Sequence, residues 1–441
     1  MGYLEQIFFA LALAGFGWLI FQRFQGIVST IQAAKPIDLS DNSSQRWKNV
    51  FLLAFGQKKM FQKPLVAIFH LFIYSGFLLI NIEVLEIVLD GLLGTHRLFF
   101  PILGSFYAIL INFFEGLSLL VVISCLVFLV RRWFLPIARL THSDLNGFPK
   151  NDALYILYIE LVLMFALWKM NAIDAVLQSR GVEHYPKAGT FLISQNLIPL
   201  FESYSTATLI IFERISWWFH ILGILSFALY VTYSKHLHIF FAFPSTYFSN
   251  LNSSGKISYM PSVFQEIKIM MGEAQDTGQA PDPNQKFGAK DVLDLTWKNA
   301  LDAYSCTECG RCTEQCPANA SGRLLSPRKI MMATRDRLEQ VSANRKENTG
   351  IFKEDGKSLL NDFISAEELR ACTTCQACVE ACPINLNPLD IILQLRRYQI
   401  MELSDAPSHW NSMFNNLETS QSPWKFNPSD RFNWSKTDES N

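Results

Sequence analysis

Long apolar runs, separated by short polar segments, fill the first 243 residues of this 441-residue chain. A helix needs about 20 mostly apolar residues to cross a bilayer, and five runs approach or exceed that length. They lie at residues 6–22, 64–90, 98–130, 153–175 and 205–234. From about Pro244 onward the pattern becomes polar and charged. The pattern therefore predicts an all-α five-helix transmembrane bundle over residues 1–243, followed by a soluble region.

The soluble region divides into three parts by composition. Residues 244–286 contain Asn-Ser-Ser-Gly and Pro-Asp-Pro-Asn, which predict a linker with one short helix near residues 263–271. Residues 287–400 hold eight of the nine cysteines, with helical patterns between them at 327–341 and 365–371. Residues 401–441 are rich in Asn, Ser, Trp and Phe without periodicity. We expect this last part to be a tail that docks on a partner protein.

Lysine and arginine gather in two of the loops between the apolar runs. They are Arg23, Lys35, Arg46, Lys48, Lys58, Lys59 and Lys63 after the first run, and Arg131, Arg132, Arg139 and Lys150 after the third. Cytoplasmic loops carry this excess, so the N-terminus is predicted outside and the soluble half in the cytoplasm. The first run lacks a basic n-region and a cleavage site, so it is interpreted as a retained span. The apolar runs predict the lipid bilayer as a partner, and the absence of a basic run predicts no nucleic acid.

The cysteines form two copies of one spacing, C-x2-C-x2-C-x3-C-P, from Cys306 to Pro317 and from Cys372 to Pro383. In bacterial two-cluster ferredoxins with this spacing, three cysteines bind one [4Fe–4S] cluster and the fourth binds the other. The spacing predicts a mostly α, dicluster ferredoxin-like domain with two [4Fe–4S] clusters. The expected ligands are Cys306, Cys309, Cys312 and Cys382 for the first cluster, and Cys316, Cys372, Cys375 and Cys378 for the second.

Two other uses of cysteine fit the sequence less well. A zinc ribbon pairs two C-x2-C units and has no use for a third and fourth cysteine followed by proline, twice. A disulfide framework belongs to small domains in oxidising compartments, which this chain does not resemble. Cys125 lies alone in the third apolar run and is expected to be a packing residue.

Histidines in or beside the apolar runs are candidate haem ligands. His220 and His238 are eighteen residues apart, five turns of helix, so a continuous fifth helix would place them on one face, with His236 about 160° away. His70 lies at a depth that matches His238 on a different helix. These positions predict a b-type haem held by His70 and His238, and His220 as a ligand of a second haem. His96 and His184 are weaker candidates at the outer side.

The membrane histidines and acids also have purely structural interpretations. A lone membrane histidine can form a hydrogen bond between helices or anchor a helix at the interface. The acidic residues within the apolar runs need either internal partners such as Arg97 and Arg214, or a role in a quinone and proton pathway. They are Glu83, Glu86, Glu115, Glu160 and Glu213.

The membrane half resembles the cytochrome b subunit of respiratory nitrate reductase. The resemblance rests on His70 and on His220 with Ser234-Lys235-His236-Leu237-His238-Ile239. It implies five spans and two b haems, with the same eighteen-residue interval between the two histidines of the fifth span. The family's second histidine of the second span corresponds to Ile80 here. One or two haem b groups are therefore expected.

The soluble half, from about Asp291, resembles the C-type iron–sulfur component of heterodisulfide reductase. The first cysteine motif followed by Ser326-Pro327-Arg328-Lys329 carries this resemblance. The fusion of both halves resembles bacterial membrane iron–sulfur oxidoreductases found beside electron-transfer flavoprotein. That family implies the bacterial inner membrane, menaquinone as exchangeable substrate, and a cysteine-rich CCG-domain region. The stretch from Ser422 to Trp434 is similar to the segment before that region, which is expected here on a separate subunit.

Three functions follow as hypotheses. The first is a membrane electron-transfer subunit of a quinone oxidoreductase, between a soluble flavoprotein or CCG-domain partner and menaquinone. The second is the corresponding subunit of a heterodisulfide- or sulfite-reductase-like complex, and the third is a non-redox membrane anchor. Nothing in the sequence resembles a nucleotide-binding glycine loop or a flavin site. The chain alone is therefore expected to be one subunit of an enzyme complex.

Overall fold

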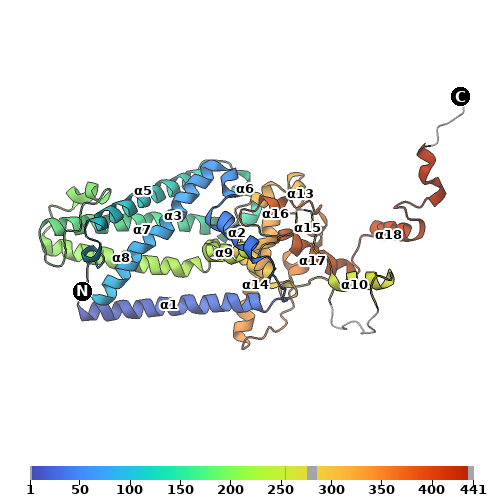
Figure 1. The fold of residues 1–441 in the computed structure, drawn as a ribbon, viewed down its shortest axis with the longest axis horizontal. Coiled ribbons are helices and arrows are strands. Elements are labelled where there is room, and N and C mark those ends of the chain that lie inside the picture. Colours follow the sequence, from blue (N-terminus) through green and yellow to red (C-terminus); the bar gives the residue numbers. More distant parts are fainter. Residues whose placement is uncertain (1, 254, 276–285, 436–441) are drawn as a thin grey trace, which may run out of the picture.

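The computed structural model describes residues 2–253, 255–275 and 286–435, and the described residues form helices without any strand. Five helices are long and apolar enough to cross a membrane, which confirms the predicted number. They are α1 (Tyr3–Gln32), α3 (Pro64–Leu93), α5 (Ser105–Trp133), α7 (Phe148–Ser179) and α8 (Thr206–Val231). Figure 1 shows them as an elongated bundle with the soluble domain at one end, here named the cluster end. The N-terminus lies at the opposite, far end.

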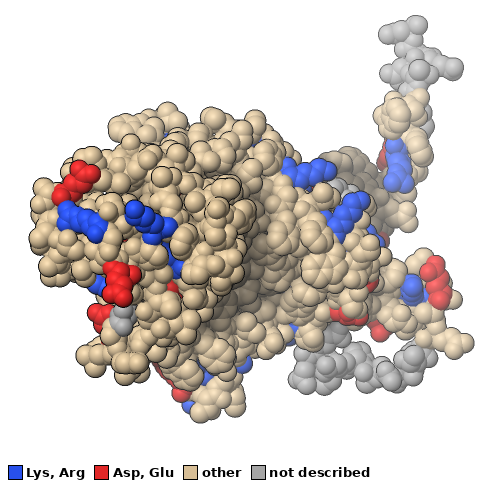
Figure 2. Space-filling model, turned by 60° about the vertical axis from the view of Figure 1, so that its left-hand side comes forward, with Lys and Arg blue, Asp and Glu red and all other residues tan. Residues whose placement is uncertain are grey.

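A glycine lets two helices of the bundle approach closely, and many large apolar side chains are exposed on the bundle surface. A Cβ atom added at Gly76 of α3 would fall 2.4 Å from the Val121 side chain of α5, so glycine permits this close approach. Leu11, Ile102 and Ile109 are 63%, 74% and 65% exposed. Figure 2 shows a broad area of the bundle surface without charged side chains. A bilayer is the natural solvent for such a surface, and the chain is a membrane protein.

Shorter helices connect the spans and build the soluble domain. Around the bundle are α2 (Ser43–Asn49), the π-helix η1 (Val50–Phe55), α4 (Phe100–Leu103), α6 (Ala138–Thr141) and α9 (His238–Tyr247). The remaining α-helices are α10 (Pro261–Met270), α11 (Trp297–Ser305), α12 (Arg311–Glu314), α13 (Pro317–Ala320), α14 (Pro327–Glu347), α15 (Ala366–Arg370), α16 (Ala377–Ala381), α17 (Pro388–Met401) and α18 (Ser408–Ser420). Figure 1 shows α18 extending away from the body of the protein.

The predicted linker comprises residues 244–286, and its first residues pack against the rest of the protein. The Ser245 hydroxyl donates to Asp302 of α11 at 2.7 Å. The Arg46 guanidinium donates to the Tyr247 and Ser249 carbonyls at 3.1 and 3.2 Å. Packed structure therefore continues past residue 243. Residue 254 and residues 276–285 of the linker, like residues 436–441 of the tail, lie outside the described residues.

Helix α1 is longer than the predicted first span, residues 6–22, because its last turns pack on the soluble domain. Ile27 is buried in the same core as Leu338 of α14. Arg23 forms a bidentate ion pair with Glu339, with nitrogen–oxygen distances of 2.8 and 2.7 Å. Helix α1 therefore runs along the bundle and also attaches the soluble domain to it.

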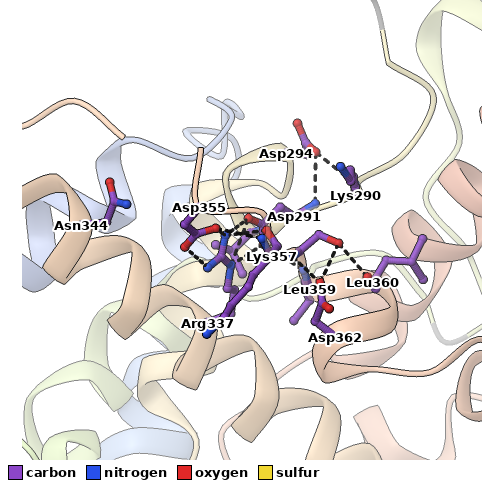
Figure 3. Close-up of polar contacts among 12 residues, drawn as sticks. Lys290, Asp291, Asp294, Arg337, Asn344, Asp355, Lys357, Leu359, Leu360 and Asp362 are labelled. Carbon is purple, nitrogen blue, oxygen red and sulfur yellow. Dashed lines mark hydrogen bonds and ion pairs between the residues drawn. The ribbon is translucent and has the colours of Figure 1, made fainter. Parts of the chain in front are cut away.

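A buried arginine connects the segment before the first cysteine motif to the segment between the two motifs (Figure 3). Arg337 of α14 is fully buried and pairs with Asp291 at 2.7 Å and with Asp355 at 2.6 Å. The same guanidinium donates to the Lys357 carbonyl at 2.8 Å, and Asp291 accepts from the Leu359 amide at 3.0 Å. Each nitrogen of the guanidinium donates a hydrogen bond. The network therefore joins α14 to the segment at Asp291 and to residues 355–359.

Replacing Arg337 with methionine is expected to destabilise the soluble domain by about 3 kcal/mol, because two carboxylates lose a buried cation. The measurement is the temperature at which the full-length protein loses its iron–sulfur absorbance. Arg323→Met is the matched control, because Arg323 is exposed and has no side-chain ion pair among the described residues. Equal melting temperatures for the two variants would contradict a stabilising role for the network.

Candidate iron–sulfur and haem sites

The two cysteine loops have the same backbone conformation. Glu308 and Gly310 of the first loop have φ angles of 55° and 73°, and the equivalent Thr374 and Gln376 of the second have 57° and 63°. Two residues in the left-handed backbone conformation, at the same positions in each loop, curve the backbone. This curvature can bring the first three cysteines of each loop to its inner side. At Gly310 a Cβ atom would fall 2.5 Å from the Arg328 guanidinium and 3.2 Å from the Arg139 carbonyl, so the packing at this position favours glycine.

The first loop and the end of the second motif surround one cavity. Its lining includes the four cysteines predicted for the first cluster, together with Cys378: Cys306, Cys309, Cys312, Cys378 and Cys382. Cys382 comes from the second motif, so the folded chain brings the fourth predicted ligand to the first loop. Burial raises the pKa of the Cys382 thiol to about 12, and the neighbouring thiols of Cys309 and Cys306 add to this effect. The assignment of these four thiols to one cluster stays a prediction.

The four cysteines predicted for the second cluster also lie close to one another. Burial raises the pKa of Cys378 to about 12, with further contributions from the thiols of Cys372, Cys316 and Cys375. Cys316 comes from the first motif, so the exchange between the motifs is reciprocal. Among the described residues, no three His, Cys, Asp or Glu side chains are grouped closely enough to hold a single metal ion.

Backbone amides point at two of the cysteine sulfurs. The Thr374 amide donates to Cys372 Sγ at 3.4 Å, and the Leu386 amide donates to Cys382 Sγ at 3.3 Å. Amide donors stabilise the negative charge of cluster thiolates and influence their reduction potential. Burial, shared loop conformation and amide donors all fit an iron–sulfur cluster in each loop.

The first cysteine loop is fixed to the membrane domain by arginines. Arg139, which follows α5, donates to the Cys309 carbonyl at 2.8 Å. Arg328 is fully buried, donates to the Arg139 carbonyl at 2.6 Å and forms an ion pair with Asp144. Arg311, inside the loop, donates to the Lys59 carbonyl at 3.0 Å. These contacts hold the first loop against the bundle.

A buried ion pair joins the first cysteine loop to the histidine segment. Lys235 Nζ lies 2.6 Å from Glu308 Oε2, and Arg335 pairs with the other oxygen of the same carboxylate. Burial raises the pKa of Glu308, but Arg335 and Lys235 outweigh that effect and hold it below its usual value. Lys235 and Glu308 are 73 residues apart and no sequence pattern links them, so the sequence alone does not predict this pair.

Two of the predicted haem ligands have their Nδ1 atoms fixed by carbonyl-type oxygens. His70 Nδ1 lies 3.0 Å from Gln57 Oε1, and His238 Nδ1 lies 3.1 Å from the Lys235 carbonyl. This arrangement orients each ring and leaves Nε2 available, as in metal-ligating histidines. The His236 Nδ1 is buried without a hydrogen-bond partner among the described residues.

The structure contradicts the prediction that His220 and His238 lie on one face of a continuous helix. Helix α8 ends at Val231, and a 3-10 turn (Lys235–Leu237) separates it from α9, which begins at His238. Just after the end of α8, the Asp152 carboxylate of α7 accepts from the Ser234 hydroxyl at 3.0 Å and from the Lys235 amide at 3.2 Å. The eighteen-residue interval therefore does not place the two histidines on one helix face.

The histidine segment, residues 235–238, is here named the junction. The rings of His236 and His238 lie 5.5 Å apart. The Lys235–Glu308 ion pair holds this segment beside the first cysteine loop. The junction therefore joins the membrane bundle to the soluble domain.

The other candidate histidines lie away from the junction. His220 is buried within α8, and its Nδ1 has no hydrogen-bond partner in the described part of the chain. His96 Nε2 lies 3.1 Å from Asp174, and its ring is 5.5 Å from that of His184. Arg97 also pairs with Asp174, at 3.0 Å. His96 is thus part of an ion-pair network, and the structure brings no further histidine of the described residues to His220.

The acids predicted to need partners are mostly satisfied inside the bundle. Glu83 pairs with Arg97 at 3.4 Å, and Glu213 pairs with Arg214 at 2.5 Å. Glu115 accepts from the Ile193 amide at 2.7 Å. Internal partners therefore account for Glu213 and Glu115, whereas Glu83 Oε2 and the Glu160 carboxylate have no hydrogen-bond partner among the described residues.

Helical membrane spans and paired cysteine loops define a class of protein: a membrane-anchored iron–sulfur protein. A family model described as "4Fe-4S dicluster domain" matches residues 305–386. This region includes both cysteine motifs, and the chain carries such a domain. The predicted dicluster fold is thereby confirmed.

Several curated proteins are similar to the chain. The "Probable iron-sulfur-binding oxidoreductase FadF" of Bacillus subtilis is 26% identical over 93% of this chain and 58% of the relative. The "EtfAB:quinone oxidoreductase" of Syntrophomonas wolfei is 24% identical over 98% of this chain and 59% of the relative. One component of a CoB-CoM heterodisulfide reductase of Methanosarcina acetivorans is 31% identical over 27% of this chain and 61% of the relative.

These relatives confirm the predicted resemblance to iron–sulfur oxidoreductases and to heterodisulfide reductase components. The chain spans about three-fifths of the length of the first two relatives. No solved structure matches the chain. The resemblance of the membrane half to a cytochrome b stays a prediction.

Proposed function

We propose that the chain is the membrane electron-transfer subunit of a quinone oxidoreductase. In this role it passes electrons between a soluble redox partner and membrane menaquinone by way of two [4Fe–4S] clusters and b-type haem. The observation that carries the proposal is the Lys235–Glu308 ion pair. It fixes the first cysteine loop beside the junction, which holds His236 and His238.

The order of the sites supports a path from the soluble domain into the bundle. Cys375 of the second motif is exposed, where a soluble partner can approach. The first loop lies deeper, in contact with Arg139 and Lys59 of the membrane domain. His70 and His238 come next, on α3 and at the start of α9. When bound, clusters and haem carry single electrons, and the protein supplies their spacing, burial and hydrogen bonds.

The orientation proposed for the chain places the cluster end in the cytoplasm and the N-terminus outside. Both lysine- and arginine-rich loops are at the cluster end: Lys63 pairs with Glu314, and Arg139 contacts the first cysteine loop. The positive-inside rule and the reducing environment that thiolates need support the same side.

The proposed soluble partner is an electron-transfer flavoprotein or a CCG-domain iron–sulfur subunit. The tail offers it exposed aromatic side chains beyond α18, with Trp424, Phe432 and Trp434 at 68%, 64% and 84% exposure. Aromatic anchors of this kind are enriched at protein interfaces. The similarity to an EtfAB:quinone oxidoreductase supports the flavoprotein.

A second candidate is the electron-transfer subunit of a heterodisulfide-reductase-like complex. The similarity to two different heterodisulfide reductase components favours it, although it covers 27% and 34% of the chain. The two candidates differ in the partner's chemistry, thiol–disulfide exchange or flavin oxidation, and share the same electron path in this chain.

The proposal is tested with the full-length protein purified in lipid nanodiscs. We expect about eight iron atoms per chain, as two four-iron clusters require, and the absorption of low-spin b-type haem. A short-tail menaquinone should reoxidise the dithionite-reduced clusters, whereas Cys309→Ser should slow that reaction strongly. Absence of haem absorption, with clusters that stay reduced when the quinone is added, would favour the non-redox anchor instead.

A further inference from the structure

An apolar groove opens on the surface of the bundle near the cluster end. It has a volume of about 590 Å³ and lies between the start of α3 and the end of α5. Leu65 and Val66 line one side, and Ile123, Leu126, Val127 and Val130 line the other. Leu65 is 66% exposed and Leu126 is 49% exposed, so the groove is open to the lipid. The volume falls within the range of about 300–1,000 Å³ typical of small-molecule sites.

One charged side chain lines this groove. Arg131 is half-buried at its end, close to Leu135 and Ile137. Within the described part of the chain, the Arg131 guanidinium has no hydrogen-bond or ion-pair partner, unlike Arg139 and Arg328 nearby. A guanidinium beside apolar surface gains by donating to an acceptor, so the groove combines apolar walls with one unused donor.

The groove lies next to the predicted electron path. Val66 precedes His70 by four residues on α3, so the two side chains lie one turn apart on the same helix face. Phe69 packs against Phe128 of α5, with ring centroids 6.5 Å apart, so α3 and α5 are in contact one residue before His70. A molecule in the groove would therefore lie within one or two helical turns of the His70 ring.

We propose that this groove is the binding site of the membrane quinone. The inference rests on the proposed function and assigns the site at which its electrons leave the protein. The quinone ring lies at Arg131, which donates a hydrogen bond to a carbonyl oxygen, and the isoprenoid tail passes Leu126 into the lipid. A phospholipid is the competing occupant, with its phosphate on Arg131. Proximity to His70 favours the quinone, because a lipid gains nothing from an adjacent redox centre.

The reaction at this site is the reduction of the quinone to a quinol by two electrons and two protons. Two electrons from the reduced soluble partner arrive one at a time, and two protons come from water at the cluster end. The two carbonyl oxygens of the quinone each gain an O–H bond, and the partner is oxidised by two electrons. Arg131 orients the ring and does not supply a proton, because arginine stays charged in proteins.

The test measures how fast a short-tail menaquinone reoxidises dithionite-reduced protein in nanodiscs. Val130→Trp fills the groove, and Arg131→Gln removes the charged donor. Each variant is expected to raise the quinone concentration at half-maximal rate by about tenfold, with cluster and haem content unchanged. Ile109→Trp is the matched control, because Ile109 is 65% exposed on the far-end part of the same helix. It should stay within about twofold of the wild type.

Three results would overturn the assignment or the function on which it rests. Wild-type kinetics in both groove variants, with an active wild type, would show that the quinone binds elsewhere. A phospholipid detected by native mass spectrometry, lost in Arg131→Gln without a kinetic change, would assign the groove to lipid. A wild-type protein whose reduced clusters are not reoxidised by quinone would refute the proposed function itself.

Discussion

Replacing Cys316 with serine is expected to remove the cluster of the second motif, although Cys316 belongs to the first. Burial and the neighbouring thiols of Cys372, Cys316 and Cys375 raise the pKa of Cys378, which is the arrangement expected if the four bind one cluster. A serine hydroxyl is a poor ligand for iron that prefers soft thiolate. The expected loss is about half of the iron, roughly four atoms of eight. Iron analysis and electron paramagnetic resonance of the reduced protein provide the measurement.

Three further variants make this result interpretable. Cys375→Ser removes a thiol of the second loop, and its spectrum should match that of Cys316→Ser. Cys309→Ser affects the first loop and should give the complementary spectrum. Cys125→Ser is the control, because Cys125 is buried within α5, apart from both loops. If Cys316→Ser instead matches Cys309→Ser, each motif holds its own cluster and the crossed assignment is wrong.

The second large effect is expected in the histidines at the cluster end of the bundle. His70→Ala and His238→Ala should each abolish the same low-spin b-type haem, because a bis-histidine haem needs both axial ligands. His236→Ala should retain it, since of these three only His70 and His238 have Nδ1 fixed by an oxygen acceptor that leaves Nε2 free. Reduced-minus-oxidised spectra and haem extraction provide the measurement.

His236 is a demanding control, because its ring lies 5.5 Å from that of His238. A general disturbance of the segment would affect both variants equally. Loss of haem with His236→Ala and retention with His238→Ala would reverse the assignment. The clusters should remain in all three variants, because none of these histidines lines the cysteine cavity.

Sequence and structure support His238 as a haem ligand for different reasons. Helical periodicity favoured it on the assumption of a continuous helix to residue 238. The Asp152 carboxylate of α7 instead accepts from Ser234 and from the Lys235 amide, and α8 ends at Val231. The periodicity of one segment contains no information about a cap that a different helix supplies. The Nδ1 contacts, visible only in the folded chain, now support the same residue.

The last turns of α1 also depend on a contact that the local sequence does not contain. The predicted first span ends at residue 22, just before Arg23. In the structure Arg23 pairs with Glu339, and the helix continues to Gln32 while Ile27 enters the soluble core. The partner is 316 residues away in sequence, so only packing could identify it.

What the sequence determined by itself depends on local geometry. Five long apolar runs become spans wherever a bilayer is the solvent, and the repeated cysteine spacing is by itself the pattern that two-cluster ferredoxins use. The tertiary structure decided everything that joins the two halves: the Lys235–Glu308 pair, the arginines around Cys309 and the groove that ends at Arg131. The physical reason is that these features need side chains from segments far apart in sequence, and their burial in one place depends on how whole helices pack.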